Sequence, residues 1–277
     1  MQNHRTSICR CISSVGLIAG LSSNATVWAA GDADAAAELA KNALNPVAAM
    51  ISVPLQYNYD QKLGPDEKGS KHVLNIQPVI PMSISSDWNL ISRTIVPLVD
   101  QHNVPTDGVD KSGVGDVLQS FFFSPKEPTA SGTIWGIGPA FGLRTASDST
   151  LGSGKWSAGP TAVMLNQGNG WTYGVLANHL WSFAGDSQRD DLSVTFIQPF
   201  LSYTFPGFTT LGINAESTYN WKADQWSVPI NLTVTQLLKI GGQPLTLAAG
   251  VRYWAESPTG GPQGVGARLA LTFLFPK

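Results

Sequence analysis

Hydrophobic and polar residues alternate along most of this chain in runs of about ten residues. The runs are rich in Val, Ile, Thr and aromatic residues, and Gly, Pro, Asn, Asp and Ser separate them. About twelve such runs, each long enough to cross a bilayer as a tilted strand, predict an all-β fold, a transmembrane antiparallel β-barrel. The predicted strands are residues 48–59, 72–84, 88–99, 115–123, 133–143, 156–166, 171–181, 192–203, 209–221, 226–239, 243–254 and 265–275.

The last run shows the alternation most plainly. Ala267, Leu269 and Leu271 share one face of the predicted strand, whereas Arg268 and Thr272 share the other. The ninth and tenth runs repeat this pattern. Lipid outside the barrel and water inside explain it, although a soluble sandwich would bury the same apolar faces against a second sheet.

The connections between the runs favour the barrel over the sandwich, because they alternate in length. An even number of strands returns both chain ends to the periplasm, so long loops should be extracellular and short turns periplasmic. The long connections are 60–71, 100–114, 144–155, 182–191 and 255–264. The short ones are 85–87, 167–170, 205–208 and 240–242. The connections at 124–132 and 222–225 depart from the alternation.

The N-terminus has the arrangement of an export signal. Two arginines precede an apolar run at 12–21, and small residues follow it up to Ala29. The run is too short for a membrane anchor, so we predict a signal peptide at residues 1–29. Cys9 and Cys11 would leave with it, and the mature chain would then contain no cysteine.

The segment between the signal peptide and the barrel, residues 30–47, is a predicted leader. Its alanine-rich stretch at 32–44 predicts a short helix that ends at Asn45 and Pro46. The helix could be solvated in the periplasm or could tuck into the lumen, and we favour the solvated arrangement. The barrel would then occupy residues 48–277.

Composition narrows the functional classes. Of 277 residues only 13% are charged, and the net charge of −2 gives no basic excess to bind nucleic acid. Beyond the N-terminus no run of about 18 apolar residues predicts a membrane helix. The expected location is the bacterial outer membrane, with lipid as one partner and a small solute as the other.

Two residue types mark particular places on the predicted strands. Tryptophans at strand ends are typical of the interfacial girdles of membrane barrels, and these are Trp171, Trp181, Trp221, Trp226 and Trp254. Prolines within strands should each mark a bulge or a locally broken ladder, and these are Pro54, Pro78, Pro81, Pro97, Pro160, Pro199 and Pro229.

The positions of the histidines do not favour catalytic or metal chemistry. His72, His102 and His179 are scattered without metal-ligand spacing. His179 could serve an outward-facing serine hydrolase site, but the position two residues along, where the nucleophile should stand, is Trp181. We therefore expect no enzyme activity, no metal and no cofactor.

The candidate site is the set of polar residues predicted to face the lumen. These are Gln77, Arg93, Asp116, Gln198, Asn214, Glu216, Asn231, Arg252 and Arg268. They either line a water-filled path for solute or form a network that fills a closed lumen, and we favour the path. The two functions that follow are a channel for small, aromatic or otherwise apolar solutes and a non-conducting structural barrel.

Arg93 and Glu216 carry a specific expectation. A charge facing lipid costs about 2 to 4 kcal/mol for Arg at mid-membrane, so the lumen is the favourable place for both. We expect Arg93→Ala to shift a conducting lumen toward cations and Glu216→Ala toward anions, with little effect on assembly.

Short motifs across the predicted mature chain resemble those of a known family. They are NPVA at 45–48, SVPLQ at 52–56, NIQPVIP at 75–81, WNLISRTIVPL at 88–98, GVGD at 113–116, GP at 159–160, QPFLSY at 198–203 and ESTYNW at 216–221. In this order they resemble bacterial outer-membrane proteins named for the MetA pathway of phenol degradation. The resemblance implies a transporter-like barrel, while the ending Phe275-Pro276-Lys277 departs from the terminal aromatic residue of many such barrels.

Overall fold

The computed structural model describes residues 33–276, which form one short helix and a closed antiparallel barrel of twelve strands. The predicted signal peptide lies outside the described residues. The helix is α1 (Ala33–Ala43). Nine strands cross the barrel unbroken: β1 (Ile51–Leu63), β4 (Trp88–His102), β7 (Thr133–Leu143), β8 (Lys155–Gly168), β9 (Trp171–Gly185), β10 (Ser193–Thr204), β13 (Gln225–Ile240), β14 (Gln243–Glu256) and β15 (Gly264–Phe275).

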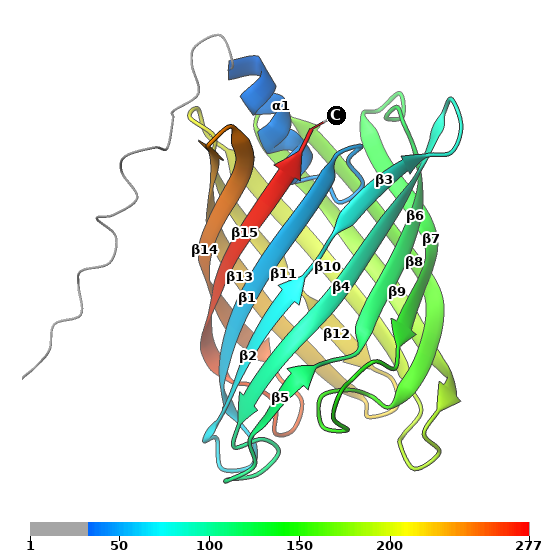
Figure 1. Cartoon of the computed structure of the whole chain (residues 1–277), viewed down its shortest axis with the longest axis vertical. Helices are drawn as coiled ribbons and strands as arrows, with labels where there is room; N and C mark the ends of the chain where they lie inside the picture. The colour runs from blue at the N-terminus through cyan, green and yellow to red at the C-terminus, as the bar shows by residue number, and fades with distance from the viewer. Residues whose placement is uncertain (1–32, 277) are drawn as a thin grey trace, which may run out of the picture.

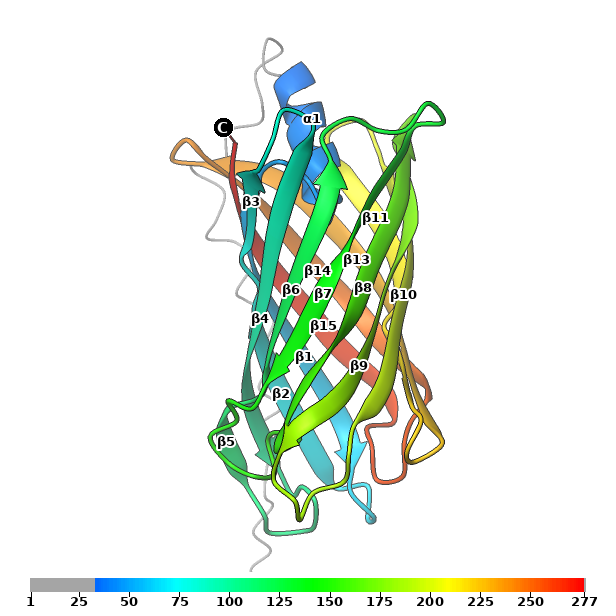
Figure 2. The same ribbon diagram turned by 90° about the vertical axis from the view of Figure 1, so that its right-hand side faces the viewer.

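The other three crossings are each made of two segments. They are β2 (Gly69–Ile76) with β3 (Val79–Ser83), β5 (Lys111–Val114) with β6 (Val117–Pro125), and β11 (Thr209–Ala215) with β12 (Ser217–Asn220). Consecutive crossings pair with one another, and β15 returns to β1 with Phe275 opposite Ile51, which closes the barrel (Figures 1 and 2). The predicted fold class is confirmed.

Each of the three interruptions faces a proline on the neighbouring strand. The amide of Gln77 donates to the carbonyl of Pro54 at 2.8 Å, and the amide of Glu216 donates to that of Pro229 at 3.0 Å. Proline has no N–H to return to the ladder, so the pairing breaks there. Pro97 faces the third interruption in the same way. The expectation was wrong for Pro81, which lies in an unbroken β3–β4 ladder.

The strands extend further than the sequence pattern predicted. β1 runs to Leu63 and β2 begins at Gly69, so most of the predicted loop 60–71 is strand, and β4 likewise runs to His102. The polar residues in these stretches were interpreted as loop residues, but several of them face the lumen. The difference in length between the loops at the two ends is therefore smaller than predicted.

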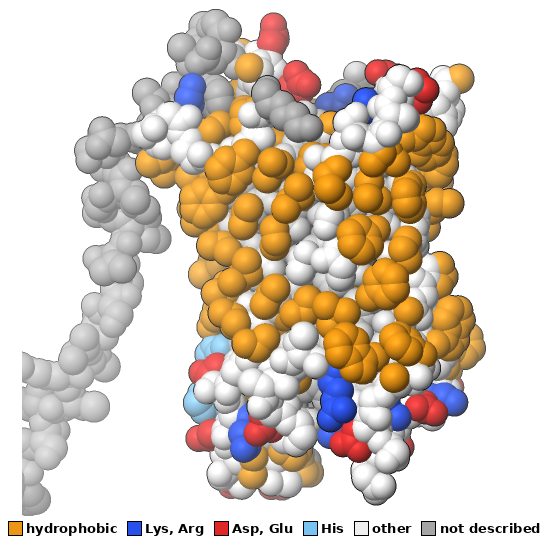
Figure 3. Space-filling model, turned by 45° about the vertical axis from the view of Figure 1, so that its right-hand side comes forward, with side chains coloured by type: hydrophobic (Ala, Val, Ile, Leu, Met, Phe, Trp, Pro, Cys, Tyr) orange, Lys and Arg blue, Asp and Glu red, His pale blue; other side chains and the backbone are white. Residues whose placement is uncertain are grey.

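The outer surface carries a belt of apolar side chains. Ile213, Val234, Val251 and Leu269 point outward and are each about half exposed, at 45%, 51%, 51% and 53%. On the face that Figure 3 draws, apolar side chains likewise cover the middle of the barrel, and charged side chains gather mainly at the end opposite α1. Because the outside is apolar at this level, the wall is suited to lipid rather than to water. No helix among residues 33–276 is long and apolar enough to span a membrane.

The leader does not extend into solvent as we had favoured. Helix α1 lies at the barrel end that holds the C-terminus (Figure 1), and its buried face consists of Ala36, Leu39 and Ala40. These side chains pack against Leu237 of β13 and Leu274 of β15, which point into the barrel. The apolar stripe of this amphipathic helix packs against apolar side chains inside the mouth. Burial of the stripe there is more favourable than its exposure to water.

Candidate functional site: the barrel lumen

Glu216 and Arg268 form the centre of the lumen. The Arg268 guanidinium donates to both carboxylate oxygens of Glu216, at 2.8 and 2.7 Å, and its Nε donates to Asn58 Oδ1 at 2.8 Å. Arg268 is only 4% exposed. A guanidinium paired with a carboxylate through two hydrogen bonds can be buried in this way, whereas an unpaired one would be costly. The interruption between β11 and β12 falls at Glu216 itself.

Arg252 extends this ion pair toward β1. Its guanidinium lies 3.5 Å from Glu216 and 3.3 Å from Asp60, and it stacks 4.8 Å from the ring centre of Trp254. The indole N–H of Trp254 donates to Asp60 at 2.7 Å. Trp254 therefore points into the lumen, and its prediction as an interfacial girdle residue was wrong. Lys71 stands opposite Asp60 in the β1–β2 ladder, so both face the lumen.

Arg93 lies apart from that cluster. It donates to Gln77 Oε1 at 3.0 Å, and this is the one hydrogen bond of its guanidinium within the described part of the chain. Asn231, which is fully buried, donates to Asn214 at 2.8 Å. Gln198 lies beside Arg93 and Gln77 in the lining of the lumen.

Eight of the nine predicted residues thus line or fill the lumen, and Asp116 serves another purpose. Its carboxylate accepts from the amides of Thr145 and Ala146, at 3.2 and 3.1 Å, and from the amide and hydroxyl of Ser153, at 2.6 and 2.8 Å. It thereby holds both ends of the loop at residues 144–154 against the barrel rim. The structure gives Asp116 no contact with the central charges.

The same loop carries Asp148, a carboxylate whose pKa is lowered. The Thr150 amide, followed by the Lys111 ammonium and the Thr150 hydroxyl, lowers the pKa of Asp148 to about 2. Asp148 therefore stays ionised at all physiological pH values, and its ion pair with Lys111 persists.

Two adjoining cavities occupy the lumen on either side of Arg93. The first, which we call the leader cavity, has a volume of about 310 Å³ and lies between Arg93 and leader residues 43–46. The second, the inner cavity, has a volume of about 340 Å³ and extends from Arg93 to Glu216. Five residues line both cavities, and these are Arg93, Gln77, Gln198, Gln56 and Leu176. A solute that moves along the lumen must therefore pass them.

One wall of the lumen is apolar. The inner cavity is also lined by the inward-facing side chains Ile95, Leu118, Leu180, Val194 and Phe196. Ile95 lies on the same strand as Arg93, and Val194 and Phe196 lie on the same strand as Gln198. A buried cluster of Val47, Val79, Ile91, Phe122, Val163, Leu165 and Leu176 continues this wall toward the leader. Only polar residues were predicted to face the lumen, so this wall is a new finding, although its members alternate with outward residues in the same strands.

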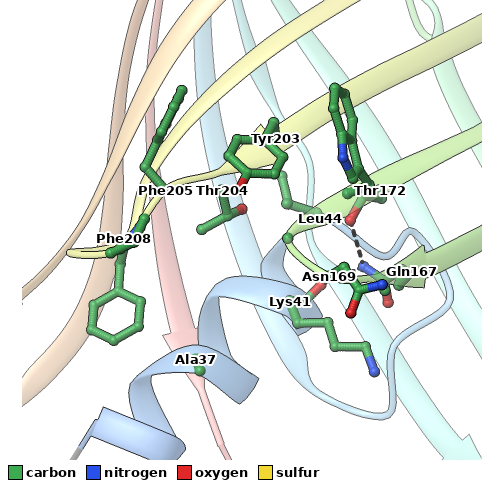
Figure 4. A pocket seen from close by; sticks show the side chains of 14 residues that line it. Ala37, Lys41, Leu44, Gln167, Asn169, Thr172, Tyr203, Thr204, Phe205 and Phe208 are labelled. Atoms are coloured by element: carbon green, nitrogen blue, oxygen red, sulfur yellow. Dashed lines mark hydrogen bonds between the residues drawn. The ribbon is translucent and has the colours of Figure 1, made fainter.

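Leader residues occupy part of the mouth at the α1 end. Val47, 5% exposed, belongs to the apolar cluster inside the barrel, and the carbonyl of Lys41 accepts a hydrogen bond from Gln167 at 2.8 Å. Figure 4 shows the groove of about 430 Å³ that remains between α1 and the β8–β9 and β10–β11 turns. Any path through the lumen must run past the leader or displace it.

His179 lies on the outer wall rather than in the lumen. Its Nδ1 is 2.7 Å from the Thr195 hydroxyl, and its Nε2 is 3.4 Å from Ser193 Oγ on the adjacent strand. The ring also stacks on Trp181 with a centroid distance of 4.0 Å. A nucleophile was expected on the same strand as His179, whereas Ser193 lies on β10. Its 3.4 Å contact is too long for a well-formed O–H···N bond.

The comparisons with known proteins concern the fold. No protein-family model matches the sequence, and no curated protein matches it. The resemblance to the phenol-degradation family is therefore not confirmed.

Solved outer-membrane proteins do match the structure. The chain is similar to an outer membrane channel from Pseudomonas putida, with a TM-score of 0.65 and 14% identity over 82% of this chain and 96% of the other. Two further structures are less similar. The β domain of the Bordetella autotransporter BrkA matches with a TM-score of 0.43 and 12% identity over 82% of this chain and 100% of the other. Pseudomonas putida OprB matches with a TM-score of 0.36 and 11% identity over 91% of this chain and 100% of the other. The protein accordingly has the fold of an outer-membrane β-barrel.

Proposed function

We propose that this protein is a channel of the bacterial outer membrane that passes small, aromatic or otherwise apolar solutes. The observation that carries the proposal is the pair of cavities that meet at Arg93 inside a closed barrel. The charges of the lumen are paired with one another or line these cavities, an arrangement compatible with a solute path. The apolar wall beside them favours solutes with apolar surface. The likeness to an outer membrane channel supports the same conclusion.

The topology fits this location. Both described ends of the chain lie at the end of the barrel that carries α1, and an outer-membrane barrel places this end in the periplasm. The larger loops at 103–110 and 144–154 would then face the cell exterior.

A non-conducting structural barrel is the second candidate function. The observation that favours it is the leader, because α1 and Val47 are buried in the mouth. If this contact never opens, the barrel would act through its loops or its lipid contacts.

A flux measurement separates the two functions. We expect vesicles that contain the folded protein to swell in arabinose several times faster than protein-free vesicles, because a pentose is small enough for the lumen. Stachyose, a much larger sugar, should not enter, and heat-unfolded protein should give no swelling. Swelling no faster than that of protein-free vesicles, both for the parent and for a variant with the leader displaced, would favour the structural barrel.

A further inference from the structure

The lumen holds more positive than negative charge. Its central side chains comprise four cations, Lys71, Arg93, Arg252 and Arg268, and two carboxylates, Asp60 and Glu216. Both carboxylates are engaged, Glu216 by Arg268 and Arg252, and Asp60 by Arg252 and Trp254. The excess charge is therefore positive, and low-dielectric walls strengthen its field.

Of these four cations, Arg93 is the one that lines the two cavities, so it is the positive charge that a solute there would meet. Arg252 and Arg268 point their guanidinium groups at carboxylates, whereas Arg93 donates one hydrogen bond, to the neutral amide of Gln77. A guanidinium has five N–H donors in a planar fork that matches a carboxylate. Arg93 therefore retains donors that face the cavities it lines.

The remainder of the inner cavity restricts what can bind there. Its volume of about 340 Å³ lies at the lower end of the ~300–1,000 Å³ range of small-molecule sites. Leu118, Leu180, Val194 and Phe196 form an apolar wall within the same cavity. A small inorganic anion would leave this wall in contact with water, and a neutral apolar molecule would leave the donors of Arg93 unpaired.

We propose that the inner cavity binds small monocarboxylates with an apolar body, whose carboxylate pairs with Arg93 and whose apolar part lies on the wall around Phe196. This rests on the proposed channel function and names the class of its solute. Glu216 lines the same cavity and attracts Arg93, but its carboxylate is already bound by Arg268 and Arg252, which reduces its repulsion of a bound anion.

Equilibrium binding to the full barrel in detergent tests this without requiring conduction. The probes are benzoate, the nearly isosteric neutral benzamide, and acetate, which keeps the carboxylate but lacks the apolar body. We expect the parent to bind benzoate roughly tenfold or more tightly than either of the others, as a charge-assisted hydrogen bond and burial of the ring would each provide.

Two variants assign this preference to the cavity. Arg93→Gln should remove the preference of benzoate over benzamide, and Phe196→Ser should reduce that of benzoate over acetate. Arg144→Gln, the same change on an exposed loop, should leave both unchanged. Equal binding of benzoate and benzamide by the parent, or a preference that survives Arg93→Gln, would overturn the proposal.

The channel function can fail separately. Benzoate binding that depends on Arg93, without sugar flux, would refute the channel alone. Sugar flux without a preference for benzoate would refute the solute class alone.

Discussion

A Val47→Asp variant is expected to carry several times more current across a planar bilayer than the parent protein. Val47 lies in the apolar cluster inside the barrel, with Val79, Ile91 and Phe122 among its members. Burial of such a side chain contributes about 1.5–3 kcal/mol, and an unpaired carboxylate in its place adds a desolvation cost of a few kcal/mol. A change of about 5.5 kcal/mol in the free energy of leader docking is enough to change a mostly docked leader into a mostly released one.

Ala49→Asp provides the matched control. Ala49 lies two residues further along and is exposed, so the same carboxylate stays in water and the leader should remain docked. If Val47→Asp folds and conducts no more than Ala49→Asp, the leader does not limit the current. A rise in both variants would show that leader charge, rather than release of the leader, affects the current.

Glu216→Ala should lower the free energy of unfolding of the barrel by about 3–5 kcal/mol, the usual cost of leaving a buried charge without its partner. The change leaves Arg268 without its bidentate partner and Arg252 with Asp60 alone. The temperature at which the protein loses its compact, fast-migrating form on a gel reports this loss. Our expectation from sequence, that this substitution would have little effect on assembly, is revised because Glu216 is the shared partner of two arginines.

Glu256→Ala, at the exposed end of β14, should leave that temperature unchanged. Adding Arg268→Met to Glu216→Ala should recover part of the loss, because it removes one of the stranded charges. The account of the network would be contradicted if the double variant lost as much stability as the sum of its two single variants.

The sequence was sufficient to predict the barrel because period-two alternation reports directly on a wall between lipid and water. It also identified Arg268, Glu216 and Arg252, because each lies on the strand face that alternates with the apolar, lipid-type face. It could not show that these three meet, since they come from β15, the β11–β12 break and β14, and the contact depends on barrel closure.

Two features escaped the sequence for physical reasons. Asp60 and Lys71 look like loop residues because isolated charges usually lie in water, whereas here they face other charges inside the barrel. The place of the leader depends on the match between its short apolar stripe and the inner surface around Leu237 and Leu274. That surface exists only once the barrel has closed.

The central claim, that solutes pass through the lumen, can be tested with two neighbouring positions on β10. Gln198 lines both cavities, while Ile197 points outward and is 39% exposed. The predicted mature chain has no cysteine, so single cysteines can be placed at either position in the Val47→Asp background. The measurement is the bilayer current before and after a charged methanethiosulfonate reagent is added. We predict that the reagent blocks the current of Gln198→Cys and leaves that of Ile197→Cys unchanged, whereas a current that persists unaltered in both would contradict a path through the lumen.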